Sequence, residues 1–394
     1  MRIGIITEYN PFHLGHAAQL AAVRQRIPDA VIIVAMSGSF VQRGLPAVID
    51  KWTRAAEAVH AGADLVVELP VLSVLRSAES FAAGGIHLLV ALGIDALAFG
   101  MEQPDALNRL RHIPTGSALR PYLETGCSYG EARTRALAAI DPVAAELTRR
   151  PNNLLAGYYL RALHDLAPTA APMALPRYTA KSAATVLGLP LPAEDRPVSA
   201  SMIRTHLTDT LPDGLLAADT AAALRTSPAR TVPARYEDLA LADLRRFTPL
   251  LAATYGSFSE GLEHRWYARR HAATLDEFWG AVRTKRIPLA RLRRLTAQLL
   301  LRITGADLAR HDTTPAAWVR PLAMNARGAA VLKHSALPVI SKTADAPARL
   351  EPSVYRRFAY DLLATDIAAL TADAPAARAG GQDYLRHPIT VPYA

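Results

Sequence analysis

The chain is poor in the features that define several protein classes. Its 394 residues include one cysteine, Cys127, which excludes a disulfide framework and a metal site built from cysteines alone. The longest apolar stretch, residues 81–99, is interrupted by glycine, histidine and aspartate, so it indicates a helix and a buried strand and predicts no membrane span. No basic segment followed by a long apolar run opens the chain. We therefore expect a cytoplasmic, globular protein without a membrane partner.

Acidic residues are also scarce relative to basic ones. The chain has 44 Lys and Arg against 35 Asp and Glu, a net charge of +9. Most of this excess lies in residues 261–302, where ten basic residues face three acidic ones. Such a block is the electrostatic signature of a nucleic-acid partner, and the alternative is a solvated helix face.

No nucleophilic triad and no carboxylate pair stands out. The most informative segment is a polar, glycine-containing turn near the N-terminus. It reads Thr7-Glu8-Tyr9-Asn10-Pro11-Phe12-His13-Leu14-Gly15-His16, between an apolar run and an alanine-rich helical pattern. The order predicts a buried strand, a tight turn and a helix whose free N–H groups and dipole attract phosphate. His13 and His16 add donors, and Gly15 lets a ligand approach the backbone.

This H-x-G-H arrangement, in its context of strand and helix, is typical of enzymes that attack the α-phosphate of ATP and release pyrophosphate. The chemistry is an in-line displacement that depends on positioning and charge stabilisation, so it requires no carboxylate pair. A helix-capping turn with two ordinary histidines and a zinc pair are the alternatives. No third ligand cluster lies near the histidines in the sequence, so we expect no metal site.

The first two hundred residues alternate apolar runs with helical patterns, which predicts a parallel α/β sheet covered on both faces. Because ligands of such sheets bind at the carboxyl ends of the strands, we expect the H-x-G-H turn, the segment after the second strand and Gly100 to meet in one crevice. The expected strands are 2–7, 30–36, 64–68 and 95–99, and the expected helices are 14–26, 50–61 and 74–92.

Two further segments are candidates for this crevice. Ser37, Gly38 and Arg43 follow the second strand, where small residues allow close contact and the guanidinium can face a phosphate or carboxylate. Asp50 is a plausible N-cap of the next helix. Lys51 can reach into the crevice, although an exposed helix lysine is the more ordinary interpretation.

Later polar residues extend the candidate site. Asn153 fits a helix cap, while Asn152 can read an adenine edge or a ribose, and Arg177 at a strand end can bind phosphate. In residues 198–204, Ser199 and Ser201 precede a helical turn and Arg204, which predicts either a second phosphate site or a capped helix.

The second half of the chain is mainly helical. We expect a catalytic unit in residues 1–205, a connector in 206–235, a basic helical region in 236–310 and a small α/β or helical region in 311–394. Within the last region we expect a helix near residues 328–333, a short strand at 337–340 and a final helix at 351–370.

Together these segments resemble one family, the bacterial tRNA(Met) cytidine acetate ligases of the H-x-G-H nucleotidyltransferase superfamily. The resemblance rests on residues 4–16, 36–44, 49–54, 64–70, 99–100, 151–153 and 198–204, and continues into 260–265 and 284–294. Leu14, Ser39 and Ala200 depart from the residues expected in that family. The resemblance implies a Rossmann-like nucleotidyltransferase fold followed by a mainly helical region.

It also implies the reaction and its participants. Such an enzyme activates acetate with ATP and Mg²⁺ as acetyl-adenylate, releases pyrophosphate and acetylates N4 of the wobble cytidine of elongator tRNA(Met). His13 and His16 are then catalytic. The implied ATP site comprises Thr7, Glu8, Tyr9, Asn10, Pro11, Phe12, His13, Leu14, Gly15, His16, Ala17, Ala18, Gln19, Leu20, Gly100, Asn152, Arg177, Ser199, Ser201 and Arg204, and the implied tRNA contacts are Arg265, Lys285, Arg286, Arg291, Arg293 and Arg294.

Two alternatives remain at this stage. A nucleotidyltransferase that makes a dinucleotide cofactor would share the catalytic half, but it leaves the basic block unexplained. A non-catalytic RNA-binding protein with a degenerate nucleotide fold would explain the block, but the intact His13, Gly15, His16 and Arg204 argue against it.

Overall fold

The computed structural model describes residues 1–206, 215–255, 258–315 and 317–392. In these residues seven strands form one sheet in the order β5-β4-β1-β2-β3-β6-β7. The five strands from the first half are parallel, which confirms the predicted parallel sheet and adds β5 to the four expected strands. Strand β6 joins β3 in antiparallel fashion. The strands are β1 (Arg2–Thr7), β2 (Val31–Ser37), β3 (Leu65–Leu69), β4 (Ala96–Met101), β5 (Ala171–Pro176), β6 (Pro321–Met324) and β7 (Ile389–Thr390).

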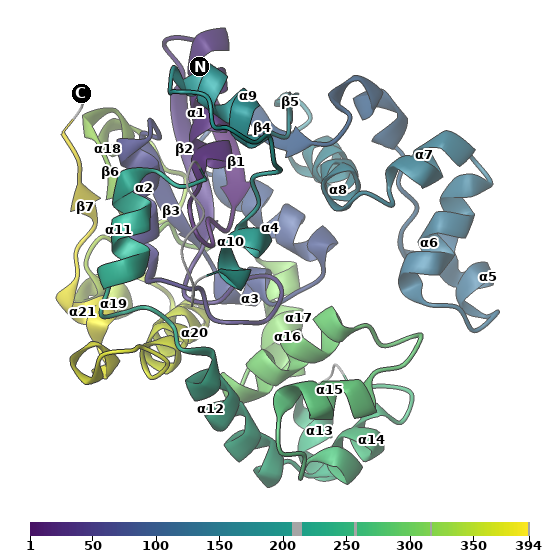
Figure 1. Cartoon of the computed structure of the whole chain (residues 1–394). Helices are drawn as coiled ribbons and strands as arrows, with labels where there is room; N and C mark the ends of the chain where they lie inside the picture. Colours follow the sequence, from purple (N-terminus) through teal and green to yellow (C-terminus); the bar gives the residue numbers. More distant parts are fainter. Residues whose placement is uncertain (207–214, 256–257, 316, 393–394) are drawn as a thin grey trace.

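Helices cover both faces of the sheet (Figure 1) because the buried strands present apolar side chains alternately to each side. In β1, Ile3 and Ile5 pack with residues of α1 and α2, while Ile6 packs with residues of α4 and α8. The covering helices are α1 (Leu14–Arg26), α2 (Lys51–His60), α3 (Val71–Val74), α4 (Ala78–Val90), α8 (Pro151–Leu166) and α9 (Ala180–Leu187). The helix expected at 74–92 is in fact the pair α3 and α4, with Ser77 capping α4.

Two groups of helices lie beside the sheet domain. An arm projects from it on the right of Figure 1 and packs around its own small core, in which Cys127 is buried. The arm comprises η1 (Pro104–Leu110), η2 (Gly116–Leu119), α5 (Arg120–Leu123), α6 (Tyr129–Ala138) and α7 (Pro142–Leu147). A helical lobe lies below and comprises α12 (Pro233–Arg246), α13 (Pro249–Tyr255), α14 (Leu262–Arg269), α15 (Leu275–Val282), α16 (Leu289–Leu300) and α17 (Gly305–Thr313).

The core of the helical lobe is continuous with the sheet domain. Trp266, Phe278 and Leu292 cluster with Phe40 from the loop after β2 and with Leu72 of α3. Burial of large apolar side chains on both sides, worth about 1.5–3 kcal/mol for each, therefore fixes the lobe against the loop that follows β2.

The predicted connector is more regular than expected in its described part. Residues 207–214 lie outside the described residues, but α10 (Ala200–Thr205) precedes them and α11 (Ala218–Thr226) follows. Pro228 lies between α11 and α12, and Pro233 is the first residue of α12, where a missing N–H group is tolerated.

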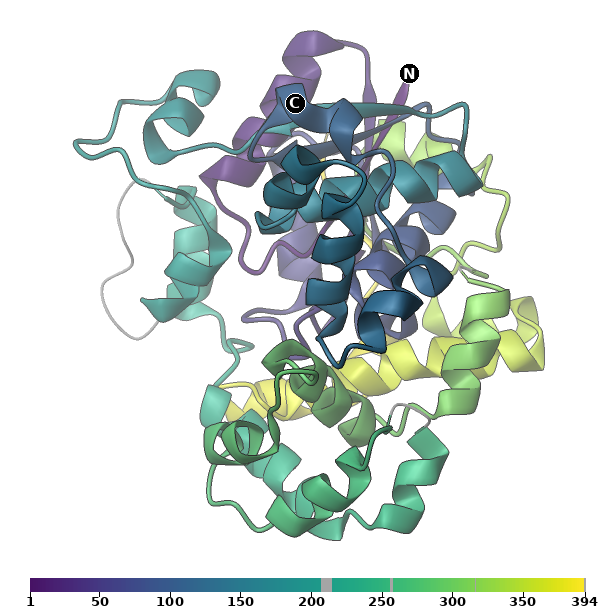
Figure 2. The same cartoon turned by 90° about the vertical axis from the view of Figure 1, so that its right-hand side faces the viewer.

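The region expected at 311–394 contributes to the central sheet instead of standing apart, since β6 and β7 extend it beyond β3. The short strand expected at 337–340 was wrong: these residues make one bridge, between Val319 and Val339. Figure 2 shows α20 (Pro352–Ala369) running between the sheet domain and the helical lobe. The other elements here are α18 (Ala326–Leu332), η3 (Thr343–Asp345), α19 (Ala346–Arg349), η4 (Pro375–Arg378) and α21 (Gln382–Leu385). No helix in the described part of the chain is long and apolar enough to cross a membrane.

Candidate functional site

The turn between β1 and α1 places two histidine rings against each other. The rings of His13 and His16 stack with centroids 3.6 Å apart and planes 14° apart. The backbone N–H of His13 donates to Nδ1 of His16 at 3.3 Å. A ring nitrogen that accepts a hydrogen bond carries no proton, so the neutral His16 ring holds its proton on Nε2.

Both rings are uncharged near neutral pH. Burial lowers the pKa of His13 to about 3, and the guanidiniums of Arg177 and Arg204 add to this shift. Burial, the neighbouring His13 and Arg177 lower the pKa of His16 well below its ordinary value. His16 therefore acts as a hydrogen-bond donor through Nε2.

The turn opens on a cavity of about 420 Å³ at the carboxyl ends of the parallel strands. It is built from β1, α1, the loop after β2, α4, β4, α8 and the segment after β5, so segments far apart in the sequence converge on it. Ten of the residues named from the sequence line it: Thr7, Glu8, Tyr9, Asn10, His16, Gln19, Arg43, Gly100, Asn152 and Arg177.

The other residues between Pro11 and Leu20 do not line the cavity. Phe12, Ala17 and Leu20 belong to the core between α1 and the sheet, and Leu14 and Ala18 pack against α9. Consecutive residues of a helix point to different faces, so a continuous run cannot line one cavity with all its side chains. A Cβ at Gly15 would lie 3.1 Å from the His13 ring, so this glycine leaves space for the stacked histidine.

Three loop candidates prove wrong as cavity residues. Ser37 and Gly38 lie beneath the loop, where the buried guanidinium of Arg54 donates to both of their carbonyl oxygens. Lys51 is neither in the crevice nor exposed: its Nζ is fully buried and lies 2.8 Å from Glu68 and 2.9 Å from Asp383. The carboxylates of Glu68 and Asp383 are buried between β3 and the C-terminal segment, so they require the positive charge of Lys51. Asp50 caps α2 as predicted.

Polar contacts set the orientation of the later candidates. Asn152 donates from Nδ2 to Glu102 at 2.7 Å, and the buried Asn153 accepts from the N–H groups of Glu102 and Gln103. Asn153 is therefore not the helix cap that the sequence suggested: it lies within α8 and joins this helix to the end of β4.

The segment before α10 has the geometry of a capped helix. The hydroxyl of Ser199 accepts from the N–H of Met202 at 3.2 Å. Arg204 donates to the carbonyl of Asn10 at 2.6 Å and to the Ser201 hydroxyl at 3.0 Å, while Ala200 lines the cavity. Arg204 therefore ties α10 to the H-x-G-H turn.

Sequence reasoning missed Gln42 and Tyr159, which also line the cavity. The N–H of Gln42 donates to Glu8 at 2.7 Å and its amide donates to the carbonyl of Arg76 at 2.9 Å. A signal for Tyr159 exists, since Asn152, Leu155 and Tyr159 follow the spacing of one helix face. In the described residues no group of three His, Cys, Asp or Glu could hold a metal ion.

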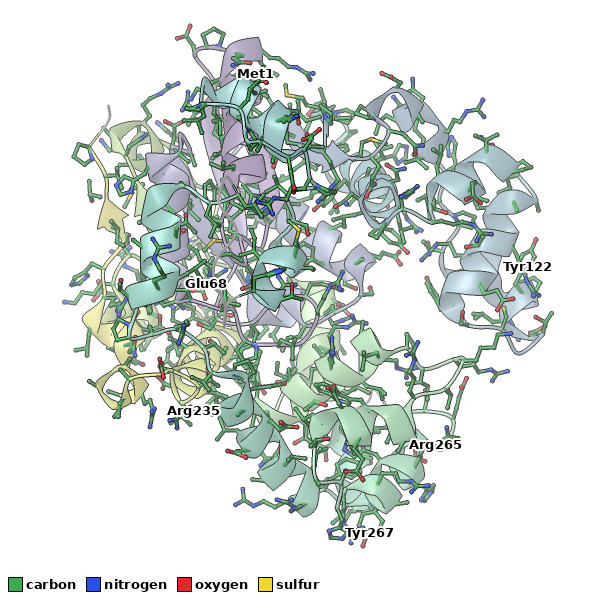
Figure 3. The ribbon with its side chains drawn as sticks, in the orientation of Figure 1. Met1, Glu68, Tyr122, Arg235, Arg265 and Tyr267 are labelled. Atoms are coloured by element: carbon green, nitrogen blue, oxygen red, sulfur yellow. The ribbon has the colours of Figure 1, made fainter. Side chains whose placement is uncertain are left out.

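The basic block is spread over the helical lobe. Arg265 lies at the outer side of the lobe (Figure 3), and the exposed Lys285 and Arg286 contact the arm, 3.6 Å from Glu131 and 3.0 Å from the Gly126 carbonyl respectively. Arg293 lies over the Trp279 ring. Arg291 and Arg294 line a cavity of about 400 Å³ between α16, α17 and the residues after α3.

The chain is similar to known proteins over most of its length. A family model described as HIGH nucleotidyl transferase matches residues 1–383. A tRNA(Met) cytidine acetate ligase of Acetivibrio thermocellus is 30% identical over 98% of this chain and 99% of its own, and one of Alkaliphilus metalliredigens is 35% identical over 98% of each. The crystal structure of Thermotoga maritima TmcAL with alpha-thio ATP superposes over the whole of both chains with a TM-score of 0.89 at 24% identity.

Proposed function

We propose that this chain, which belongs to the tRNA(Met) cytidine acetate ligases within the HIGH nucleotidyl transferase family, activates acetate with ATP and acetylates N4 of the wobble cytidine of elongator tRNA(Met). The observation that carries the proposal is the stacked His13–His16 pair at the start of α1, with His16 and Arg177 in the wall of one cavity. It is the arrangement that an attack on the α-phosphate requires.

The first step forms acetyl-adenylate. An acetate oxygen attacks the α-phosphorus, and the bond from that phosphorus to the bridging oxygen breaks, which releases pyrophosphate. The Nε2–H of His16 and the guanidiniums of Arg43 and Arg177 supply donors to the phosphoryl oxygens, where charge develops. Mg²⁺ bound to the triphosphate would supply further stabilisation of the charge on its oxygens.

The second step transfers the acetyl group to tRNA. The basic helices of the lobe support this part of the proposal, because Arg291, Arg294 and Arg76 line the second cavity, beside α16. The carbonyl of Arg76 accepts a hydrogen bond from Gln42, which lines the cavity at the H-x-G-H turn, so the two cavities are neighbours. Phosphate contacts of this kind position an RNA chain without reading its sequence. Since ATP and tRNA are both cytoplasmic, we assign the enzyme to the cytoplasm.

The test is mass spectrometry of tRNA incubated with the purified protein, ATP and isotopically labelled acetate. Labelled N4-acetylcytidine at the wobble position of elongator tRNA(Met) is the expected product. Pyrophosphate release that depends on some other small molecule, with no labelled nucleoside, would retain the adenylylating step and reject acetylation of tRNA.

A further inference from the structure

The acetyl-transfer step requires a proton acceptor that the histidine pair does not supply. The exocyclic N4 amine of cytidine shares its lone pair with the ring, so it is a weak nucleophile and must lose a proton as the new C–N bond forms. A positioned general base contributes about 10²–10⁴-fold to such a step.

Most ionisable groups that line the cavity are unsuited to this task. His16 carries its proton on Nε2, because Nδ1 accepts from the His13 backbone. Arg43 and Arg177 are donors only. Burial raises the pKa of Tyr9 and of Tyr159, so both hydroxyls stay protonated. Among the described residues that line the cavity, Glu8 is the one carboxylate.

The surrounding chain fixes Glu8 at the wall of the cavity. One carboxylate oxygen accepts from the Gln42 N–H at 2.7 Å, and the main-chain carbonyl of Glu8 accepts from Arg54 at 2.6 Å. Among the described residues no cation forms an ion pair with this carboxylate, although the guanidiniums of Arg204, Arg43 and Arg54 lie near enough to act on its pKa. Glu8 therefore has an oriented carboxyl group, and no side chain among the described residues donates a hydrogen bond to its second oxygen.

The electrostatic surroundings of Glu8 suit a base that works near neutral pH. Burial raises the pKa of Glu8, while the Gln42 N–H and the guanidiniums of Arg204, Arg43 and Arg54 oppose this shift. Burial, and after it the charge of Glu8, raises the pKa of Tyr159 on α8. A base is most effective when its pKa approaches the working pH, so a raised carboxyl pKa favours proton transfer.

We propose that Glu8 is the general base of acetyl transfer, which accepts the N4 proton of the target cytidine. As the N4 lone pair bonds to the acetyl carbon, the bond from that carbon to the adenylate oxygen breaks and AMP leaves with the electron pair. The N4 proton passes to the free oxygen of Glu8. This inference rests on the proposed function, since it names the residue that completes its second step.

The test separates the two steps in a Glu8→Gln variant, whose amide oxygen can still accept from Gln42. Acetate-dependent ATP–pyrophosphate exchange measures adenylate formation, and single-turnover transfer of labelled acetyl to tRNA measures the second step. We expect the ratio of transfer to exchange to fall about 100-fold. Wild-type transfer should slow as the pH falls through the Glu8 pKa, and the Gln variant should lack this acid limb.

Two further variants make the result decisive. Glu8→Asp keeps a carboxylate and should retain the acid limb at a reduced rate. Glu102→Gln removes a carboxylate that holds Asn152 but lies outside the cavity wall, so it should reduce exchange and transfer by the same factor.

Equal losses of exchange and transfer in Glu8→Gln would assign Glu8 to nucleotide or Mg²⁺ binding and overturn the proposal, as would an acid limb that persists. A wild-type enzyme that exchanges pyrophosphate but never acetylates tRNA would instead contradict the proposed function.

Discussion

The two histidines of the motif occupy unequal positions. His13 is 5% exposed and lies behind the cavity wall, while His16 is part of that wall. The ring stack and the hydrogen bond from the His13 N–H to Nδ1 orient the His16 ring, so His13 positions His16. Substitution of His16 should therefore remove a donor to the transition state directly.

We predict that His16→Ala lowers acetate-dependent pyrophosphate exchange by about 10²–10³, the usual loss when one preorganised donor to developing charge is removed. Affinity for tRNA should stay within about twofold, because the basic lobe is untouched. Exchange assays and filter binding measure the two quantities, and His164→Ala, an exposed histidine of α8, is the control. Loss of tRNA binding in His16→Ala would contradict separate sites.

A buried histidine outside the site predicts the pH dependence of stability. His311 is 3% exposed and its Nε2 lies 2.7 Å from the Ser73 hydroxyl. Burial, with Arg357 and Arg76, lowers its pKa to about 4. Between this value and the unfolded value of about 6.5, the unfolded chain binds more protons, so the free energy of unfolding falls as pH decreases.

At pH 5 this histidine should therefore account for a loss of about 2 kcal/mol relative to pH 7. Urea denaturation at both pH values measures the loss, and His311→Gln should show a smaller decrease than the wild type. Equal decreases in both proteins would show that His311 does not remain neutral in the folded state.

At the scale of elements, the loop after β2 connects the cavity to the basic helix α16. Gly44 in this loop has φ of +80°, and a Cβ there would lie 2.6 Å from the Arg293 carbonyl oxygen. The backbone of α16 therefore packs directly against a loop whose Gln42 and Arg43 line the cavity.

We predict that Gly44→Ala destabilises the protein by at least about 2 kcal/mol, through left-handed strain and a clash with rigid backbone, and lowers exchange because the loop must shift. Gly62→Ala is the matched control, since its φ is +112° but no atom lies within 4 Å of a Cβ there. It should show strain of about 1 kcal/mol and near-normal exchange. Chemical denaturation measures the free energy of unfolding of both variants, and equal decreases would contradict the close packing of Gly44 against α16.

The same helix should govern tRNA affinity. The double substitution Arg291→Glu and Arg294→Glu should weaken tRNA binding and reduce the salt slope of the affinity by about one per lost phosphate contact. The double reversal at the exposed Lys333 and Lys342 changes the net charge equally, away from α16, and serves as control. Binding titrations over a range of salt measure both, and a tRNA affinity that does not depend on salt would count against phosphate contacts.

At the scale of the whole molecule, a buried ionic network joins the C-terminal segment to the catalytic sheet. Asp383 of α21 lies 2.9 Å from Lys51 and 2.6 Å from Arg320, and Glu68 of β3 contacts both cations. Glu68 is buried, and Figure 3 labels it within the sheet domain. The C-terminal residues thereby support the base of the loop that carries Arg43.

We predict that Asp383→Ala destabilises the protein by about 3–5 kcal/mol, because it leaves two buried cations short of one anion. Asp373→Ala removes an exposed partner of Arg230 at 3.1 Å and should lower stability by less than about 1 kcal/mol. Denaturant titration measures both variants, and equal effects would show that the buried network is replaceable.

Local sequence patterns are sufficient to predict the parallel sheet, the position of the H-x-G-H turn and the crevice at the strand ends. These follow from local patterns: apolar runs for buried strands, a glycine-rich turn before a helix, and the convergence of parallel strands. The same patterns predicted that the H-x-G-H turn, the loop with Arg43 and Gly100 meet at one site, whereas Asn152 and Arg177 were assigned to it only through the family resemblance.

Contacts between distant segments determine which side chains face the cavity and which support it. The burial of Lys51 depends on Asp383, more than three hundred residues away, and the addition of β6 and β7 depends on the free edge of β3. The residues near Lys51 do not indicate Asp383 as its partner, and the residues of β3 do not indicate that β6 will pair with it. Contacts of this range are set by the packing of the whole chain, so composition and periodicity cannot supply them.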